Sequence, residues 1–112
     1  MELKEKLELL NDKSSVREIQ DYIEDMKIDR GFNTISIERE MMLMLEEFGE
    51  LAKAIRKETK GRLDPTKTYD TSVEEELADV FIYLLNIANM SNVDIFEAFK
   101  KKEKRNCNRK WE

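Results

Sequence analysis

Two groups of acidic residues stand out because each places carboxylates three residues apart within a strongly apolar pattern. The first group is Glu46, Glu47 and Glu50, and the second is Glu76 and Asp79. Residues three apart lie on one surface of an α-helix, so each group would present a pair of carboxylates from one helix. Such pairs suggest a site for a divalent cation that in turn holds a phosphate.

The need for a cation follows from the apolar residues around these acids. An unpaired carboxylate on a buried helix face is costly and tends to bind a proton instead. Two pairs on facing helices would also repel each other, unless a bound Mg²⁺ (with Mn²⁺ as a substitute) lay between them. The alternative is a set of solvated acids, since glutamates three apart are common on exposed helices. The predicted metal ligands are Glu47, Glu50, Glu76 and Asp79.

Composition excludes several classes of protein. The formal net charge is −5, from 20 Lys and Arg against 25 Asp and Glu, which does not favour a nucleic-acid partner. Histidine is absent, which excludes Ser-His-Asp chemistry, histidine-ligated zinc and a Glu-x-x-His di-iron bundle. The single cysteine, Cys107, rules out an internal disulfide framework and predicts a cytoplasmic location. The chain shows no long apolar run and no signal-like N-terminus, so no membrane partner is expected.

Apolar residues at helical spacing predict an all-α fold, and no useful strand alternation occurs. We expect a single domain over residues 1–112, with a short or frayed segment at 1–14 and a core at 15–112. The core should be an antiparallel, four-helix-bundle-like arrangement. Gly31 and Gly61 are expected to end the first two main helices. The predicted helix starts are Ser15, Ser36, Ser72 and the segment Ser91–Asp94.

Two helices in the middle of the chain carry the acids. In the first, Glu47 and Glu50 fall on a different face from the main apolar face, and Gly49 between them costs about 1 kcal/mol relative to Ala. Close approach of a backbone or a ligand would explain that glycine. In the second, residues 77–88 are apolar nearly all round, which predicts burial on most sides. The main apolar face of the first helix contains Met41, Met44, Leu45, Phe48, Leu51, Ala52 and Ile55.

The sequence resembles the MazG-type all-α nucleotide pyrophosphohydrolases over residues 36–111. The resemblance rests on Glu46-Glu47-x-x-Glu50 followed by Glu76-x-x-Asp79, within EEFGELAKAI and EEELADVFIYLLNIA, and on a Lys…Asn-x-x-Arg ending. It implies hydrolysis of a nucleoside triphosphate between the α- and β-phosphates, giving a nucleoside monophosphate and pyrophosphate, in house-cleaning of the nucleotide pool. It also implies a homodimer or homotetramer.

The resemblance assigns roles by position. The expected catalytic residues are Glu46, Glu47 and Glu50, where Glu46 would ligate the metal, orient water or act as a base. The same four acids named above would ligate Mg²⁺. Lys102, Asn106 and Arg109 match positions that contact phosphates or sugar, and Tyr83 matches an aromatic residue near the nucleoside in the compact dCTP pyrophosphatase-like branch.

At two positions the sequence does not decide how the substrate is recognised. Lys57 stands where that branch often has a tryptophan, so base recognition by stacking is in question. Lys53 lies within reach of the acidic helix face and is a candidate substrate contact, with surface ion pairing as the alternative. The alternative for the whole protein is a non-catalytic helical interaction module whose acidic site is degenerate.

Overall fold

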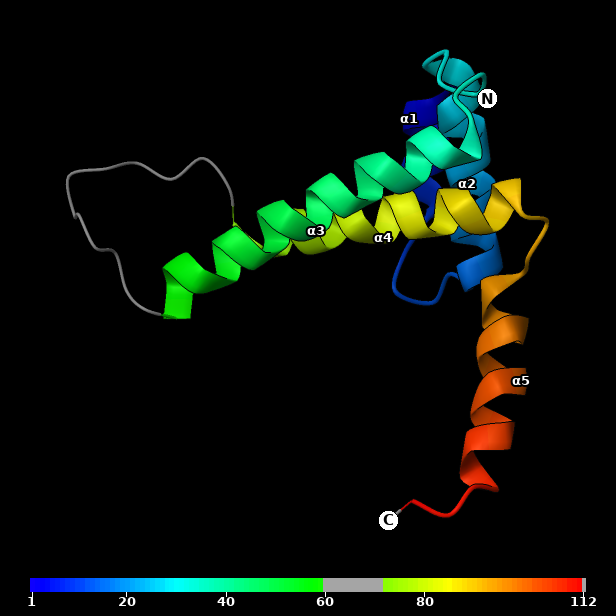
Figure 1. Ribbon diagram of the computed structural model, residues 1–112. Helices are drawn as coiled ribbons and strands as arrows, with labels where there is room; N and C mark the ends of the chain where they lie inside the picture. The colour runs from blue at the N-terminus through cyan, green and yellow to red at the C-terminus, as the bar shows by residue number, and fades with distance from the viewer. Residues whose placement is uncertain (60–71, 112) are drawn as a thin grey trace. The chain divides into compact units, whose positions relative to one another are not determined.

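The structure is a computed structural model that describes residues 1–59 and 72–111, and helices make up most of this part of the chain (Figure 1). No strand occurs among the described residues, so the all-α prediction is confirmed. The four predicted main helices are present, and the N-terminal segment forms a short helix. Gly61, which was expected to end the second main helix, lies outside the described residues. The helices are α1 (Leu3–Leu9), α2 (Val16–Asp29), α3 (Ile37–Thr59), α4 (Val73–Met90) and α5 (Ile95–Cys107).

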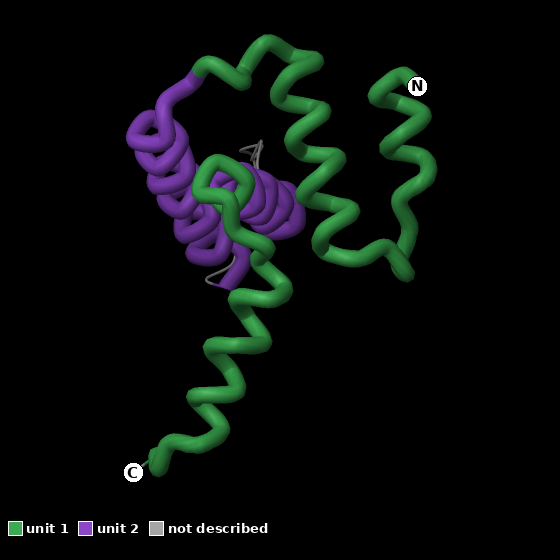
Figure 2. The backbone as a smooth tube through the Cα atoms, turned by 90° about the vertical axis from the view of Figure 1, so that its right-hand side faces the viewer, with its two compact units in different colours: residues 1–34, 88–112 green, residues 35–87 purple. Residues whose placement is uncertain are grey.

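The chain divides into two compact units (Figure 2). Unit 1 comprises residues 1–34 and 88–112, and therefore contains α1, α2, the last turn of α4 and α5. Unit 2 comprises residues 35–87 and contains α3 and most of α4. The expectation of a single domain with its core at 15–112 stays a prediction.

Local side-chain and backbone contacts fix both ends of α2. Ser15 and Glu18 form the predicted capping box, in which each side chain accepts a hydrogen bond from the other residue's backbone N–H, at 3.0 and 3.2 Å. Gly31 follows the helix with a φ of +74°, a conformation that glycine adopts without strain. The backbone N–H of Phe32 donates to the carbonyl of Lys27 at 2.8 Å, as expected where a glycine ends a helix.

The turn between α4 and α5 corrects the predicted start of the last helix. Asn92 has a φ of +58°, so the chain leaves the helical conformation at that residue. The cap of α5 is Asp94, whose Oδ1 accepts from the backbone N–H of Glu97 at 3.0 Å. The helix therefore begins at the far end of the predicted segment and not at Ser91, because a left-handed residue intervenes.

A buried glutamine holds this turn in unit 1. Gln20 on α2 is 0% exposed, and its Nε2 donates to Asn89 Oδ1 and to the carbonyl of Val93, both at 2.9 Å. Its Oε1 accepts from the backbone N–H of Ile95 at 2.9 Å, and Asn89 Nδ2 donates to the Gln20 carbonyl at 2.8 Å. The middle of α2 is thus joined to the last turn of α4 and the first turn of α5.

Serine caps begin both helices of unit 2, as predicted. Ser36 Oγ accepts from the backbone N–H of Arg39 at 3.2 Å, and Ser72 Oγ accepts from that of Glu75 at 3.1 Å. Each hydroxyl satisfies a backbone donor that has no partner within the helix.

Helices α3 and α4 pair in an antiparallel sense within unit 2 (Figure 1). Near the start of α3, Glu40 Oε2 accepts from Asn86 Nδ2 at 2.9 Å, and Asn86 lies near the end of α4. Further along α3, Glu47 lies beside Glu76 and Asp79 from the first turns of α4. Buried apolar residues of the two helices are Met44, Ala54, Leu85 and Ala88, of which Ala88 belongs to unit 1.

The predicted apolar face of α3 does not match the face that the chain buries. Met44 is buried, but other large members of that face are 43–57% exposed, namely Met41, Leu45, Phe48 and Ile55. The buried side of α3 instead includes Glu40 and Ala54. Because α3 packs through the face that carries Glu47, its more apolar face is left exposed.

The prediction that α4 is buried on most sides is wrong for the described chain. Leu77, Phe81 and Leu84 are 42–53% exposed, although Leu85 is 1% exposed. This helix therefore keeps an apolar surface that the described chain does not cover. None of the described helices combines the length and apolar character that crossing a membrane requires.

Candidate metal centre

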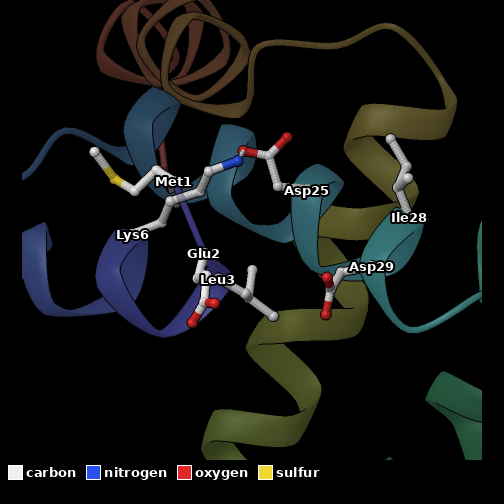
Figure 3. A pocket seen from close by; sticks show the side chains of 7 residues that line it. All are labelled: Met1, Glu2, Leu3, Lys6, Asp25, Ile28 and Asp29. Atoms are coloured by element: carbon white, nitrogen blue, oxygen red, sulfur yellow. Dashed lines mark hydrogen bonds and ion pairs between the residues drawn. The ribbon is translucent and has the colours of Figure 1, made fainter.

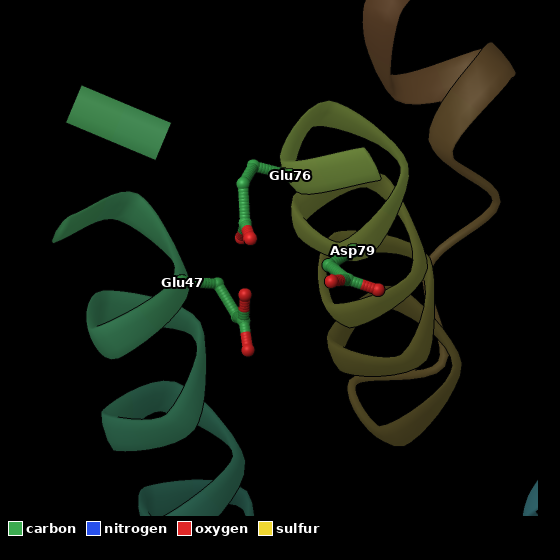
Figure 4. Close-up of side chains that lie close together, drawn as sticks. All are labelled: Glu47, Glu76 and Asp79. Atoms are coloured by element: carbon green, nitrogen blue, oxygen red, sulfur yellow. The ribbon is translucent and has the colours of Figure 1, made fainter. Parts of the chain in front are cut away.

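Three of the predicted ligands come together in unit 2. Glu47 from α3 and Glu76 and Asp79 from α4 each contribute one carboxylate oxygen to a group in which all three oxygens lie within 4.8 Å of one another (Figure 4). Glu76 and Asp79 are neighbours because they are three apart on one helix. Glu47 reaches them because it lies on the side of α3 that packs on α4. The predicted pairing of acids across two helices is thus present in the fold.

One oxygen of this group has no hydrogen-bond partner in the part of the chain that the structure describes. Glu76 is 5% exposed, and its Oε2 is buried with no hydrogen-bond partner among the described residues. Leaving a buried acceptor unpaired costs roughly 1–3 kcal/mol, and more for a charged group. Asp79 is partly exposed, so the group is open on one side. A hard cation with carboxylate and water ligands fits this donor set.

The acids also perturb one another. The pKa of Glu47 is raised from 4.5 to about 7, first by burial, then by a hydrogen bond with Glu76, and then by the charges of Asp79, Glu76 and Glu50. A carboxyl with this pKa is about half protonated at neutral pH and more so at lower pH, which reduces the repulsion among the three acids when no cation is bound. Binding of a divalent cation would displace that proton.

The other two acids of the first group lie outside the three-oxygen group. Glu50 is exposed on α3, one turn after Glu47, and its charge contributes to the raised pKa of Glu47. Glu46 is exposed, and its charge reaches Tyr83. Their roles as ligand or catalytic residue stay predictions.

Gly49 shows no close neighbour. A Cβ added to it would meet no atom within 4 Å in the part of the chain that the structure describes. Among the described residues, therefore, no other backbone approaches this glycine as was expected.

Tyr83 is partly buried and lies near several carboxylates. The pKa of Tyr83 is raised, first by burial and then by the charges of Glu40, Glu47, Asp79 and Glu46. The phenol is therefore within electrostatic reach of acids on both α3 and α4. Its predicted contact with a nucleoside stays a prediction.

The predicted substrate-binding residues on the basic end of the chain belong to unit 1. Lys102 is exposed, and Asn106 Nδ2 donates to Glu103 Oε2 at 3.3 Å. Arg109 stacks on the ring of Trp111, with its guanidinium carbon 4.4 Å from the ring centroid, and the Trp111 indole N–H donates to the Asn106 carbonyl at 3.1 Å. The end of α5 is thus ordered by its own side chains. Contact with a substrate stays a prediction for these residues, as it does for the exposed Lys53 on α3.

Sequence reasoning missed Glu40. This carboxylate is 1% exposed, and Asn86 Nδ2 donates to it at 2.9 Å. The signal was available, because Glu40 precedes Glu47 by seven residues and Asn86 follows Asp79 by seven. Residues seven apart return to nearly the same face of a helix.

A separate pocket lies in unit 1, between the N-terminal residues and α2 (Figure 3). Its volume is about 230 Å³, and Lys6 at its wall pairs with Asp25 at 3.1 Å. None of the predicted site residues lines it. The lining residues are Met1, Glu2, Leu3, Lys6, Asp25, Ile28 and Asp29.

Comparison with known protein families shows a match over most of the chain. Residues 35–110 match the MazG nucleotide pyrophosphohydrolase domain, which covers more than half of the 112 residues. The chain therefore belongs to this family. No curated protein and no solved structure matches the chain.

Proposed function

We propose that this member of the MazG family is a Mg²⁺-dependent nucleotide pyrophosphohydrolase. The reaction joins water to a (deoxy)nucleoside triphosphate, breaks the bond between the α- and β-phosphates, and releases a nucleoside monophosphate and pyrophosphate. Its role would be house-cleaning of the nucleotide pool in the cytoplasm. The observation that carries the proposal is the group of Glu47, Glu76 and Asp79, with the buried Glu76 Oε2 unpaired among the described residues.

The residues that would hold the cation follow from this geometry. Glu47, Glu76 and Asp79 supply three oxygens from two helices, and Glu50 lies one turn along α3 as a fourth candidate. Mn²⁺ would substitute for Mg²⁺, because both accept carboxylate and water oxygen. When bound, the cation would polarise phosphoryl oxygens and help position a water molecule.

The remaining predicted residues act on the substrate and the water. Glu46, adjacent to the group and exposed, would orient the attacking water or accept its proton. Lys102, Asn106 and Arg109 would contact phosphates or sugar, and positive charge there would stabilise the charge that spreads over the phosphoryl oxygens. Lys53 is a further phosphate contact in this proposal, and Tyr83 would lie near the nucleoside.

The exposed apolar faces of unit 2 support self-association. The exposed large apolar residues of α3 and α4 extend along both helices, and apolar surface of this kind commonly marks a protein interface. We propose that a second copy of the same chain covers these faces, which gives a homodimer or a homotetramer. The proposal includes neither a membrane nor a nucleic acid as a partner. The residues concerned are Met41, Met42, Leu45, Phe48, Ile55, Leu77, Phe81 and Leu84.

The deciding experiment is a panel of canonical and modified (deoxy)nucleoside triphosphates, incubated with the protein with and without Mg²⁺. The expected products are monophosphate and pyrophosphate, separated by chromatography, in the presence of metal only. Orthophosphate as the first product, or no turnover of any nucleotide, would count against the proposal. Calorimetric titration with Mg²⁺ and a nonhydrolysable nucleotide then separates a slow enzyme from the alternative of a non-catalytic helical module, which would bind neither.

A further inference from the structure

The buried bond between Glu40 and Asn86 is a polar contact in the seam where α3 meets α4. Glu40 is 1% exposed and Asn86 is 6% exposed, and their side chains are 2.9 Å apart. Met44 and Ala54 on α3 and Leu85 on α4 are buried as well. A carboxylate in such a place needs its donor, because an unpaired buried charge is strongly unfavourable. The pair therefore requires one relative position of the two side chains, more strictly than an apolar contact of the same size does.

The pair lies in register with the acidic group. Glu40 and Glu47 are seven residues apart on α3, and Asp79 and Asn86 are seven residues apart on α4. Seven residues span about 10 Å of helix and return to nearly the same face. The seam therefore has two polar layers at matching intervals, one formed by Glu40 and Asn86 and the other by the three acids.

Tyr83 lies between these layers, three residues before Asn86 and four after Asp79. The charges of both Glu40 and Glu47 act on its phenol, so one residue from each layer lies within electrostatic range of Tyr83.

We propose that Glu40 and Asn86 are positioning residues that set the register of α3 against α4 and so hold Glu47 opposite Glu76 and Asp79. A slip of one residue would turn a helix by about 100° and advance it by about 1.5 Å, which would separate the Asn86 amide from Glu40 and move the acids apart. The purely apolar part of the seam resists such a slip less strictly, because apolar packing tolerates rearrangement at constant volume. This inference rests on the proposed function in one respect, namely that the three acids bind a cation.

The pair is expected to act on the geometry of the acids more than on net stability. Replacing a buried polar or ionic pair by apolar residues of similar volume is often neutral or stabilising. Residues that support metal ligands, in contrast, alter metal affinity by roughly 10–100-fold when they are changed. These two tendencies predict that a variant without the pair keeps its stability but binds the cation more weakly.

The test compares three variants with the wild-type chain. The double variant Glu40→Met/Asn86→Leu removes the polar pair, and Glu40→Gln keeps an oxygen that can accept from Asn86. The matched control is Leu85→Ala, which removes a side chain that is 1% exposed from the same helix without touching the pair. Mn²⁺ affinity is measured by electron paramagnetic resonance, stability by urea unfolding, and register by nuclear Overhauser contacts between α3 and α4 side chains.

We expect the double variant to bind Mn²⁺ at least about 10-fold more weakly while losing no stability. Glu40→Gln should bind within about threefold of the wild type, and Leu85→Ala should lose stability while keeping its Mn²⁺ affinity. A double variant with wild-type affinity and unchanged interhelical contacts would overturn the inference. So would a Glu40→Gln variant that binds as weakly as the double variant, because the hydrogen bond would then not be the cause.

The two proposals fail in different ways. If the wild-type chain binds neither Mn²⁺ nor Mg²⁺, the metal site is wrong, and the interhelical contacts alone decide the role of the pair. Altered contacts in the double variant then support its control of register, and unchanged contacts refute it.

Discussion

Glu47 on α3 and Glu76 on α4 place like-charged carboxylates together, with oxygens within 4.8 Å, although Glu76 is only 5% exposed. Without a bound cation, partial protonation of Glu47 near neutral pH reduces the repulsion between them, as its raised pKa of about 7 indicates. The same arrangement becomes favourable when a divalent cation replaces the proton.

Cation binding should therefore depend on pH. Below about pH 7 a cation must displace a proton from Glu47, so affinity for Mg²⁺ should rise as pH rises through 7 and then level off. Calorimetry in buffers of different ionisation enthalpy should detect the released proton on the acidic side. Glu47→Gln serves as the control, since it has no proton to release; an unchanged affinity across this range in the wild type would refute the assignment.

The metal-free protein should show the opposite trend in stability. The pKa of Glu47 is higher in the folded chain, at about 7, than its ordinary value of 4.5. The folded state thus binds more protons between these values, so its free energy of unfolding from this group falls as pH rises from 4.5 to about 7. Urea unfolding in a chelator should show this slope, and the slope should shrink in Glu47→Gln or when Mg²⁺ is added.

Replacing an acid of the metal centre by its neutral amide should abolish turnover and leave the helical fold intact. Asp79→Asn and Glu50→Gln should each abolish pyrophosphate release while circular dichroism stays helical, because each removes a charged oxygen near the cation. Glu58→Gln is the matched control on α3, since Glu58 is exposed and lies outside the group. Full activity in both Asp79→Asn and Glu50→Gln would show that the site lies elsewhere.

Gly49→Ala should stabilise the isolated chain by about 1 kcal/mol, because alanine favours the helix interior and the added Cβ has open space around it. Urea unfolding at low protein concentration measures this effect, and Ala52→Gly on the same helix should lower stability by a similar amount. A loss of stability in Gly49→Ala would mean that something approaches this glycine closely, as the sequence first suggested.

Phe48→Glu should weaken self-association. Phe48 is 45% exposed in the chain, so its replacement removes little from the core but places a charge on the exposed apolar face of α3. Sedimentation velocity should show a shift from oligomer to monomer. Lys53→Glu, an exposed change of charge on the same helix, should leave the oligomer in place; equal effects of both variants would point to general electrostatics.

Gln20→Leu should destabilise the fold although it is an apolar substitution at a buried position. Three polar partners would lose their bonds, namely Asn89 Oδ1, the Val93 carbonyl and the Ile95 N–H. Each such group costs roughly 1–3 kcal/mol when left unsatisfied. Thermal unfolding measures the loss, with Asp21→Ala as the control, because its ion pair with Arg17 is exposed and contributes little.

Features that depend on neighbours in the sequence were predicted well. The serine caps at Ser15, Ser36 and Ser72 and the glycine ending at Gly31 involve bonds between residues at most five apart. The pairing of Glu76 with Asp79 follows from helical spacing alone. The start of α5 was the exception, because Asn92 adopts a left-handed conformation that asparagine permits but does not require.

Features that depend on which helix face meets which partner were predicted only in part. Acids facing each other across two helices were expected, and Glu47 does lie beside Glu76 and Asp79, but the buried face of α3 was not the expected one. The apolar pattern of α3 pointed to the face with Phe48, yet the chain buries the face with Glu40, Met44 and Ala54. Hydrophobic periodicity ranks faces by composition, and it carries no information about which face a neighbouring helix covers.

The sequence by itself therefore determined the helices, most of their ends, the acidic pairs and the family, since these follow from spacing within a few residues or from the order of residue types. Only the tertiary structure decided that Glu47, Glu76 and Asp79 converge, that Glu76 Oε2 lacks a hydrogen-bond partner among the described residues, and that Glu40 binds Asn86. These relationships join residues 29 to 46 positions apart, and helix packing alone sets the distances between them.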